Sequence, residues 1–433
     1  MKFQAPKGTR DILPGESEAW AAVEHSARDT MARYGYREVR TPMFEATDLF
    51  VRGVGASTDL VRKELYTFED KGGRSITLRP EMTAPLVRAY LEHSLGHGQP
   101  IARFAYIGPM FRYERPQAGR YRQFQQIGAE LFGPGGPAAD AEMIDLFVAI
   151  LKNAGIGEVS VLLNSLGDGA CRPQYRDALR SYFQANADRL CGDCSERLRT
   201  NPLRILDCKN PACQPVIAGA PSVLDGLCDS CREHFEGVKA ALTALAIPFE
   251  IAPRLVRGLD YYTRTVFEVH AGGLGAQNAV GGGGRYDDLV KEFGGPPTPA
   301  IGFSIGVDRL LMAASAAGAA ADGDALARPD VCVVAREPAA LAEALRVARD
   351  LRGGAGAPPD ARLTVVVDLT GRSLNAQMKW ASKTGARHVV FVPSDADGYA
   401  LRNMEAGADE PRAAGAAALR AFLLERRVQG EGR

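Results

Sequence analysis

Residues 111–130, FRYERPQAGRYRQFQQIGAE, contain two polar and aromatic arms on either side of a PQAG turn. The arrangement predicts a pair of antiparallel strands joined by a turn. Neither arm has a clean apolar face, because Arg, Glu and Gln occur at both parities, whereas a half-buried strand alternates apolar with polar residues. The hairpin is therefore either a solvent-exposed pair of strands with cross-strand ion pairs or a polar binding site.

Alternation along the two arms predicts which side chains share a face, because successive strand residues point to opposite sides. Arg112 and Glu114 share one face of the first arm. One face of the return arm carries Arg120, Arg122, Phe124, Gln126, Gly128 and Glu130. Guanidinium groups bind phosphate in a bidentate manner, and an aromatic ring can stack on a base. The hairpin thus predicts a surface for an anionic ligand with a planar part.

Composition limits the class of protein. The chain has 433 residues, 46% of them apolar and 24% charged, which is typical of a soluble globular protein of two or three domains. Lys and Arg together number 52, as do Asp and Glu, so a local patch and not a bulk positive field would have to bind nucleic acid. The first residues resemble no signal peptide, and no uncharged apolar stretch reaches the roughly 18 residues of a membrane span. We therefore expect a cytoplasmic protein without membrane contact.

The pattern along the chain divides it into several regions. Residues 1–150 and 253–312 mix strand-like and helical stretches, and residues 155–252 between them are helical and rich in cysteine. Residues 313–329, AASAAGAAADGDALARP, have low complexity and predict a linker. Strand-like and helical segments then alternate over residues 330–433, which predicts a small α/β domain with mostly parallel strands.

Five further segments carry a family resemblance: KGTRDILP (7–14), LRPEMTAPLVRAY (78–90), LVRGLDYYTRTVFEV (255–269), GGGGRYDDLV (281–290) and AIGFSIGVDRLLM (300–312). Together with residues 111–130, the sequence resembles the class II aminoacyl-tRNA synthetases in their bacterial histidyl form. Residues 34–45, 111–130 and 300–312 resemble motifs 1, 2 and 3 of that class.

The resemblance implies an α+β fold. Residues 1–328 would form a class II catalytic domain, an antiparallel sheet flanked by helices, with residues 155–252 as a helical insertion. Residues 330–433 would form an α/β anticodon-binding domain. The resemblance thins at residues 394–407, SDADGYALRNMEAG, where no residue-level anticodon contact can be assigned. Motif 1, with Pro42, implies a homodimer, although an ordinary buried strand would also explain it.

The implied activity is that of a histidine–tRNA ligase. Such an enzyme uses ATP with Mg²⁺ to convert L-histidine to histidyl-adenylate and pyrophosphate, and then transfers histidine to the 3′ end of tRNA(His). The attacking carboxylate is already ionised, so the chemistry needs positioning and charge neutralisation by arginine and Mg²⁺, with no enzyme nucleophile. This also explains the lack of a G-x-x-x-x-G-K-[ST] phosphate loop.

Site residues follow from the matched motifs. The resemblance makes Arg257 and Arg112 catalytic and assigns ATP binding to Arg112, Glu114, Phe124 and Arg309. We expect Arg309 in the first turn of a helix, where the macrodipole disfavours a cation by up to about 1 kcal/mol. Either Asp308 offsets that cost, or an anion such as the γ-phosphate does. For Arg257 the alternative is an exposed strand residue or an ion pair with Asp260.

The histidine pocket is implied in the same way. Its expected residues are Glu81, Thr83, Gln126, Glu130, Arg257, Tyr261, Tyr262 and Tyr286, the first three around the α-amino group. Thr83 could also be the N-cap of a helix, and Glu81 could simply stabilise the dipole of that helix. The run GGGG (281–284) either lets backbone approach a ligand or forms a flexible hairpin turn. The turn of motif 2 would meet the tRNA acceptor end through Gln117, Arg120 and Arg122.

Six cysteines crowd into residues 191–231. The two C-x-x-C pairs, Cys191 with Cys194 and Cys228 with Cys231, suit a structural Cys₄ zinc site that catalysis does not require. Cys208 and Cys213 are then left over, or they replace one pair. Reduced thiols in a packed helical insertion are the alternative. We expect the insertion to contact the tRNA acceptor arm, with Arg197, Arg199 and Arg204 as candidates.

Two other functions compete with the ligase. A non-catalytic regulatory subunit of ATP phosphoribosyltransferase shares the catalytic-domain fold, but it predicts loss of the catalytic arginines and of the C-terminal domain, both of which this sequence has. A zinc-dependent nucleic-acid-binding module would explain the cysteines and none of the six motifs.

Overall fold

A computed structural model describes residues 3–56, 58–272, 279–319, 323, 328–353, 362–395 and 397–430. The chain forms two compact units. The first comprises Met1–Leu13 with Ala19–Ala321, and the second Pro14–Glu18 with Asp322–Arg433. Within the described residues, no helix is both long and apolar enough to cross a bilayer.

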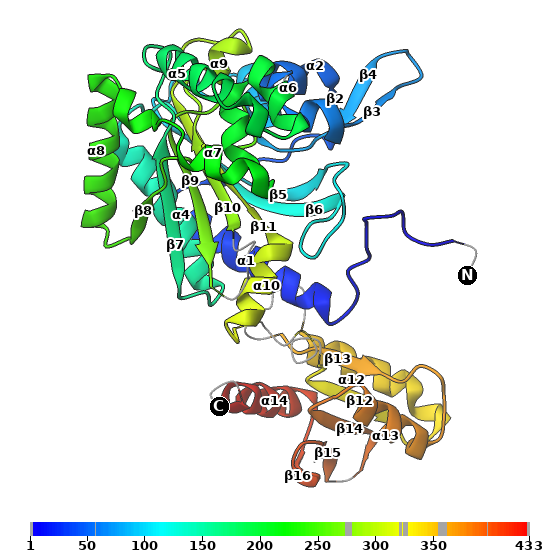
Figure 1. Cartoon of the computed structure of the whole chain (residues 1–433). Helices are drawn as coiled ribbons and strands as arrows, with labels where there is room; N and C mark the ends of the chain where they lie inside the picture. Colours follow the sequence, from blue (N-terminus) through cyan, green and yellow to red (C-terminus); the bar gives the residue numbers. More distant parts are fainter. Residues whose placement is uncertain are drawn as a thin grey trace. The chain divides into compact units, whose positions relative to one another are not determined.

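An eight-stranded sheet organises the first unit (Figure 1). Its strands, in spatial order, are β1 (Arg37–Glu38), β5 (Ala102–Phe111), β6 (Gln123–Phe132), β11 (Ala300–Gly306), β10 (Ala279–Arg285), β9 (Thr263–Ala271), β7 (Val159–Ser165) and β8 (Phe249–Ile251). The central pairs are antiparallel, and only the two edge pairs β1–β5 and β7–β8 are parallel. The expected antiparallel catalytic sheet is confirmed.

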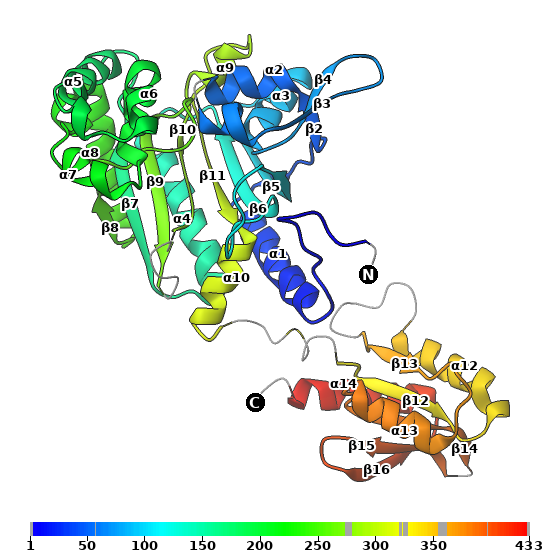
Figure 2. The same cartoon turned by 45° about the vertical axis from the view of Figure 1, so that its right-hand side comes forward.

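One face of this sheet is buried by helices. The main core joins apolar residues of α1 (Glu16–Arg33), α4 (Pro137–Asn153), α8 (Asp229–Ala244) and α10 (Val307–Ala316) to the sheet. Figure 2 shows α4 lying along this face, and it packs against β11, β6 and α8. On β6 the residues in this core are Ile127, Ala129 and Leu131, as strand alternation requires. The opposite parity of β6 is left to face the site.

Smaller elements surround the other face. A three-stranded antiparallel sheet has the order β2 (Phe44–Ala46), β4 (Ser75–Leu78), β3 (Tyr66–Glu69), and it lies beside α2 (Thr47–Phe50). Helix α3 (Thr83–Glu92) packs against α2 and α9 (Leu289–Glu292). The cysteine-rich region contributes α5 (Arg172–Gln184), α6 (Gly192–Thr200) and α7 (Gln214–Ala218), with a core of its own.

The expected insertion, residues 155–252, is longer than the segment that packs separately from the eight-stranded sheet. β7 and β8, which lie within residues 155–252, are strands of the eight-stranded sheet, and α8 packs on α4. The separate hydrophobic cluster runs from Cys171 to Cys231. Likewise, the expected linker over 313–329 begins too early, because α10 continues to Ala316. Residues 320–322 and 324–327 of that linker lie outside the described residues.

The second unit contains a five-stranded sheet of order β13 (Val365–Val367), β12 (Val331–Ala335), β14 (His388–Asp395), β15 (Gly398–Asn403), β16 (Ala408–Ala413). Helices α12 (Leu341–Arg352) and α14 (Ala416–Gly430) contribute to one of its cores and α13 (Leu374–Lys383) to the other. The expectation of mostly parallel strands was wrong for half of the pairs, since β14–β15 and β15–β16 are antiparallel. The strand responsible is β15, which lies within the segment where the resemblance thins and begins at Gly398 with φ +102°.

A buried ion pair ties β10 to α4. The Arg285 side chain is 0% exposed and donates from Nε and Nη2 to Asp140 at 3.2 and 2.7 Å. It also donates to Asp287 at 2.9 Å and to the carbonyl of Pro134 at 3.1 Å. His234 of α8 lies 3.2 Å from the same Asp140 carboxylate. Because Tyr286 follows directly, this network fixes the chain where it enters the site.

We predict that Arg285→Ala lowers the free energy of unfolding by about 3–5 kcal/mol, because it leaves the Asp140 carboxylate buried without its main partner. Urea denaturation would measure the change. Arg180→Ala is the matched control: Arg180 pairs with Asp177 at 3.3 Å on the surface, so its loss should change stability by less than about 0.5 kcal/mol. Equal effects of the two substitutions would contradict this prediction.

Candidate active site

A cavity of about 440 Å³ lies on the face of the eight-stranded sheet opposite α4. It is lined from β6, β9, β10 and β11, from the first turn of α10, from the start of α3 and from the segment that follows β5. The expected residues that line it are Glu81, Thr83, Arg112, Glu114, Arg120, Phe124, Gln126, Arg257, Tyr261, Tyr262, Tyr286 and Arg309.

Arg112, Glu114 and Phe124 form one end of the cavity. The Arg112 guanidinium lies 5.3 Å from the Phe124 ring centroid, and its Nε donates to the carbonyl of Pro80 at 2.8 Å. Glu114 faces Arg112 at 3.8 Å and Arg120 at 2.9 Å. The expected shared face is confirmed for Arg112, Glu114, Phe124 and Gln126, which line one cavity. Glu130, expected on the same face, lies behind that lining.

The hairpin itself is shorter than its sequence suggested. β5 ends at Phe111 because the Arg122 N–H donates to the carbonyl of Gly8 at 2.8 Å, outside the pair, and does not return the hydrogen bond that the Arg122 carbonyl accepts from Arg112. Side chains outside the two strands therefore no longer alternate between faces. The prediction that Arg122 shares a face with Phe124 was wrong. The Arg122 guanidinium stacks on Tyr113 at 3.9 Å and donates to the carbonyls of Glu114 and Lys7. Gln117 and Arg120 form an isolated bridge across the turn.

Glu81 caps the helix that Thr83 was expected to cap. Its carboxylate accepts from the N–H groups of Thr83 and Ala84 at 2.7 and 3.0 Å. It thereby satisfies donors at the start of α3, and Tyr261 donates to it at 3.4 Å. Burial raises the pKa of Glu81. The Thr83 hydroxyl is consequently available for another partner, Glu130.

Glu130 is buried in the floor of the site, 1% exposed, and every partner it has among the described residues is neutral. The hydroxyls of Thr83 and Tyr286 donate to it at 2.8 and 2.5 Å. Burial raises its pKa to about 8, outweighing those two hydrogen bonds, and the nearby Glu81 charge adds to the rise. Gly302 of β11 gives it room, since a Cβ there would lie 1.5 Å from Glu130 Oε2. A ligand that donates an N–H to this carboxyl would favour its ionised form.

Aromatic rings surround Glu130. Tyr261 contacts the rings of Tyr262 and Tyr286 at 4.8 and 5.6 Å between centroids, and all three side chains are buried. Gln126 donates to Ser304 at 3.2 Å. Its buried Oε1 has no hydrogen-bond partner within the described part of the chain. The pocket can thus hold a flat polar ring with an ammonium group beside it.

Arg257 reaches the cavity from the segment before β9. It pairs with Glu268 at 2.5 Å, and its buried Nε makes no hydrogen bond to any described residue. Burial opposes ionisation of Glu268, yet the hydrogen bond from His270 and the Arg257 charge outweigh it and lower the pKa of Glu268. Asp260, the partner suggested for Arg257, pairs instead with Arg204 at 2.9 Å. Arg204 is also buried, which rules it out as a surface contact for tRNA.

Arg309 lies in the first turn of α10, as expected. It donates to the carbonyl of Ala279 at 2.7 Å, while Asp308 pairs with Arg10 at 3.0 Å. Burial lowers the pKa of Arg309, and the Arg120 charge lowers it further. Two guanidinium groups near a helix N-terminus favour an anion between them.

The glycine run is a strand and not a flexible turn. Residues 281–284 lie within β10, between β9 and β11. A Cβ on Gly282 would lie 2.5 Å from the carbonyl oxygen of Phe267 and 3.2 Å from Arg257 Cζ. Glycine is therefore required here because backbone and a site arginine approach closely.

Sequence reasoning missed Glu268, although a signal was present. In RTVFEVHAG (264–272) Glu268 shares its parity with Val266, opposite Phe267 and Val269, which lie in the main core. The alternation places its carboxylate on the cavity face. Asp59 and Glu64, which also line the cavity, come from irregular helical segments with no such signal.

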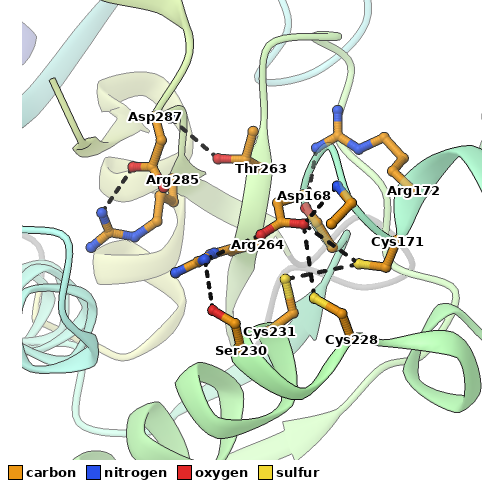
Figure 3. Close-up of polar contacts among 12 residues, drawn as sticks. Asp168, Cys171, Arg172, Cys228, Ser230, Cys231, Thr263, Arg264, Arg285 and Asp287 are labelled. Carbon is orange, nitrogen blue, oxygen red and sulfur yellow. Dashed lines mark hydrogen bonds and ion pairs between the residues drawn. The ribbon is translucent and has the colours of Figure 1, made fainter. Parts of the chain in front are cut away.

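The expected zinc ligands do not meet as one set. Cys191 and Cys194 group with Cys208 and Cys213, which was the alternative considered. Cys228 and Cys231 group instead with Asp168 and Cys171. The spacing identified the pairs correctly but not which pairs come together, because α6 and α8 begin at different places in the insertion. Figure 3 shows the second group, with Asp168 between its cysteines and Arg264.

Comparisons with known proteins agree with this geometry. A sequence profile of the family described as histidyl-tRNA synthetase matches residues 8–310. A histidine–tRNA ligase of Halothermothrix orenii is 49% identical over 412 residues, 94% of this chain and 96% of that protein. Another, from Geobacillus thermodenitrificans, is 48% identical over the whole of both chains. The crystal structure of apo S. aureus histidyl-tRNA synthetase has a TM-score of 0.79 at 35% identity, covering 98% of this chain and 100% of that one.

The raised pKa of Glu130 makes stability depend on pH. The folded protein keeps this proton up to about pH 8, whereas an unfolded chain releases it near pH 4.5. Its contribution is therefore full below pH 4.5 and is lost as pH rises through about 8, at no more than about 1.4 kcal/mol per pH unit. Glu130→Gln cannot titrate, so the variant should gain stability relative to the ligand-free wild type between pH 5 and 8.

Urea denaturation at several pH values would measure this gain. Glu236→Gln, at a side chain 61% exposed, is the control, and its difference from wild type should stay constant. A constant difference for Glu130→Gln as well would contradict the prediction.

Proposed function

The chain belongs to the histidyl-tRNA synthetase family, and we propose that its cavity binds L-histidine and ATP side by side on the antiparallel sheet. The activity is that of a histidine–tRNA ligase, which forms histidyl-adenylate from L-histidine and ATP and then transfers histidine to the 3′ end of tRNA(His). One observation carries the assignment of the cavity: it holds the anion-binding guanidinium groups of Arg112, Arg257 and Arg309 beside the buried carboxyl of Glu81. A second buried carboxyl, Glu130, lies behind this lining and accepts from the lining residues Thr83 and Tyr286.

The imidazole of histidine would occupy the tyrosine-lined pocket. A ring N–H would donate to Glu130, which already accepts from Tyr286 and Thr83 and has no cation beside it among its hydrogen-bond partners. The α-ammonium would bind Glu81 and the buried Oε1 of Gln126. A side chain without a ring nitrogen would leave Glu130 buried without that donor, so discrimination should be strong.

ATP would occupy the other end of the cavity. Its adenine would stack on Phe124 and donate its amino group to Glu114, and Arg309 would bind the γ-phosphate near the helix N-terminus. Mg²⁺ arrives with ATP, and the carboxylates of Glu114 and Glu268 in the same cavity are oxygen ligands of the kind it prefers.

Charge neutralisation is the catalytic task. The histidine carboxylate attacks the α-phosphorus, pyrophosphate leaves, and negative charge grows on the α-phosphate oxygens. Arg112 and Arg257 would bring the two anions together. The Arg112 Nε is held by the Pro80 carbonyl, so its terminal nitrogens stay directed into the cavity, and the Arg257 Nε has a donor to spare. Because such donors are already in position, they lower the activation barrier without any cost of reorganisation.

The remaining contacts involve RNA and a second subunit. The 116–120 turn, with Gln117 and the half-exposed Arg120, lies against Met312 of α10 and would meet the acceptor end, Arg122 supporting it through Tyr113. The cavity belongs to residues 1–328, the proposed catalytic domain, and residues 330–433 would bind the anticodon. The regulatory-subunit alternative is disfavoured, because Arg112, Arg257 and Arg309 all line the cavity.

A homodimer through motif 1 is supported by exposed apolar side chains. Met43 and Phe44 of that motif are 51% and 55% exposed, and Phe68 in the same small sheet is 48% exposed. Exposed apolar clusters of this kind mark protein interfaces.

We predict that Arg257→Ala slows histidine-dependent exchange of pyrophosphate into ATP by on the order of 100-fold or more, since one preorganised donor at the developing charge is lost. Arg257→Lys should recover part of the rate by restoring the charge. Arg254→Ala, at an exposed residue outside the cavity, should leave the rate near wild type. An Arg257→Ala enzyme with a near-full exchange rate, or a wild type without exchange, would contradict the proposed mechanism.

The proposed dimer predicts a solution mass of about 93 kDa, twice the 46.4 kDa of the chain. Light scattering after size exclusion would measure it. Phe44→Glu should shift the mass toward the monomer, because a buried interface would then hold a charge without a partner. Leu369→Glu, at a residue 66% exposed in the second unit, is the control and should remain dimeric. A monomeric wild type would rule the dimer out.

A further inference from the structure

Seven of the eight cysteines converge on two places in the insertion; the eighth, Cys332, lies in β12 of the second unit. All eight are free thiols. The first group, called the distal cluster, is Cys191, Cys194, Cys208 and Cys213. The second, called the proximal cluster, is Asp168, Cys171, Cys228 and Cys231. Each cluster brings together residues from separate helices and turns, so local sequence alone does not create it.

Both clusters have the dimensions of a tetrahedral metal site. In each, all four ligand atoms lie within 4.8 Å of one another. Cys191 Sγ and Cys208 Sγ are 3.8 Å apart in the distal cluster, as are Cys171 Sγ and Cys231 Sγ in the proximal one. Asp168 Oδ1 lies 3.8 and 3.9 Å from the sulfurs of Cys171 and Cys228. A tetrahedron with zinc–sulfur bonds of about 2.3 Å has edges of about 3.8 Å.

Backbone N–H groups and helix N-termini beside both clusters can support metal-bound thiolates. In the distal cluster the N–H groups of Cys191 and Asn210 donate to the sulfurs of Cys213 and Cys208 at 3.2 and 3.4 Å. In the proximal cluster Cys171 and Cys228 are the N-cap residues of α5 and α8, where the helix dipoles stabilise negative charge. Bonds of this kind orient metal ligands and support thiolates.

We propose that the insertion binds two structural zinc ions, one in the Cys₄ distal cluster and one in the Cys₃Asp proximal cluster. The first departs from the pairing that the C-x-x-C spacing suggested, and the second adds two ligands, Asp168 and Cys171, that the spacing did not identify. Zinc displaces the thiol protons and closes each tetrahedron. Five of the sixteen buried residues in the core of the insertion are cysteines, so this core holds few large apolar side chains. Metal cross-links would therefore stabilise it.

The proximal zinc would also brace the histidine pocket. The other oxygen of Asp168 accepts from Arg264 at 3.1 Å, and Arg264 donates to Ser230, next to Cys231, at 3.1 Å. Arg264 holds a strained φ of +47°, and its backbone exchanges hydrogen bonds with Leu166 and Gly167 at 2.7 Å. Arg172, which follows Cys171, donates to the carbonyl of Tyr262. The distal cluster lies beside a different part of the cavity: Arg204, four residues before Cys208, lines the cavity and donates to the carbonyl of Arg257 at 2.6 Å.

The direct test is the metal content of the full chain, reconstituted with zinc under reducing conditions and freed of excess metal. We expect two equivalents per chain by elemental analysis, and two after cobalt exchange, with the visible absorption of tetrahedral cobalt–thiolate sites. One equivalent or none in the wild type would overturn the proposal without recourse to any variant.

Single substitutions assign the sites. Cys208→Ser and Cys228→Ser should each reduce the zinc content from two equivalents to one, while Cys332→Ser should keep both. A single site built from the two C-x-x-C pairs would instead keep its metal in Cys208→Ser, and that result would refute the distal cluster.

Kinetics test the link to the pocket, and this part rests on the proposed function. Cys228→Ser should raise the KM for histidine severalfold with little change in kcat, and Cys332→Ser, in the second unit, should leave the KM for histidine unchanged. A KM for histidine in Cys228→Ser equal to that in Cys332→Ser would remove the bracing role. The metal content is measured independently of activity, so failure of the proposed function and failure of the zinc sites can be told apart.

Discussion

The site depends on one constraint, a carboxylate at Glu130 that is buried with only hydroxyl donors around it. A charge in such a place is costly unless it is paired, so the free protein keeps this group protonated to about pH 8. The neighbours follow from it: Gly302 makes room, Tyr286 is fixed by buried Arg285, and Thr83 is freed for Glu130 because Glu81 caps α3. In the proposed function, a ligand that donates an N–H to Glu130 relieves this constraint, and the pocket would select an imidazole in this way.

At the opposite end of the cavity the requirement is reversed, because the guanidinium groups there need an anionic ligand. Its guanidinium groups are held by fixed acceptors, Arg112 by the carbonyl of Pro80, Arg257 by Glu268 and Arg309 by the carbonyl of Ala279. Such contacts fix the direction of each guanidinium group. Because the donors are in place before ATP binds, little reorganisation is needed when charge develops. A cation-binding end and an anion-binding end within one cavity of about 440 Å³ suit a reaction that joins an amino acid to a nucleotide.

Sequence reasoning succeeded where the chain is regular and failed where strands stop. Parity placed Phe124, Gln126 and Glu130 correctly because β6 pairs along its length with β5 and β11. It failed at Arg122, since the Arg122 N–H donates to the carbonyl of Gly8 and the strand pairing ends there. Thr83 looked like a cap, but a carboxylate two residues earlier outcompeted it. Cysteine spacing identifies which thiols lie close in sequence, whereas tertiary packing decides which pairs meet, and only the structure brings Cys171 and Asp168 to the second pair.

A crystal structure of the chain with a sulfamoyl analogue of histidyl-adenylate tests the central claim most directly. The account predicts an imidazole nitrogen within hydrogen-bond distance of Glu130, the α-ammonium at Glu81 and Gln126, the group that replaces the α-phosphate at Arg112 and Arg257, and adenine on Phe124. An analogue bound with its imidazole away from Glu130, or with Arg257 still directed at Glu268 alone, would contradict it.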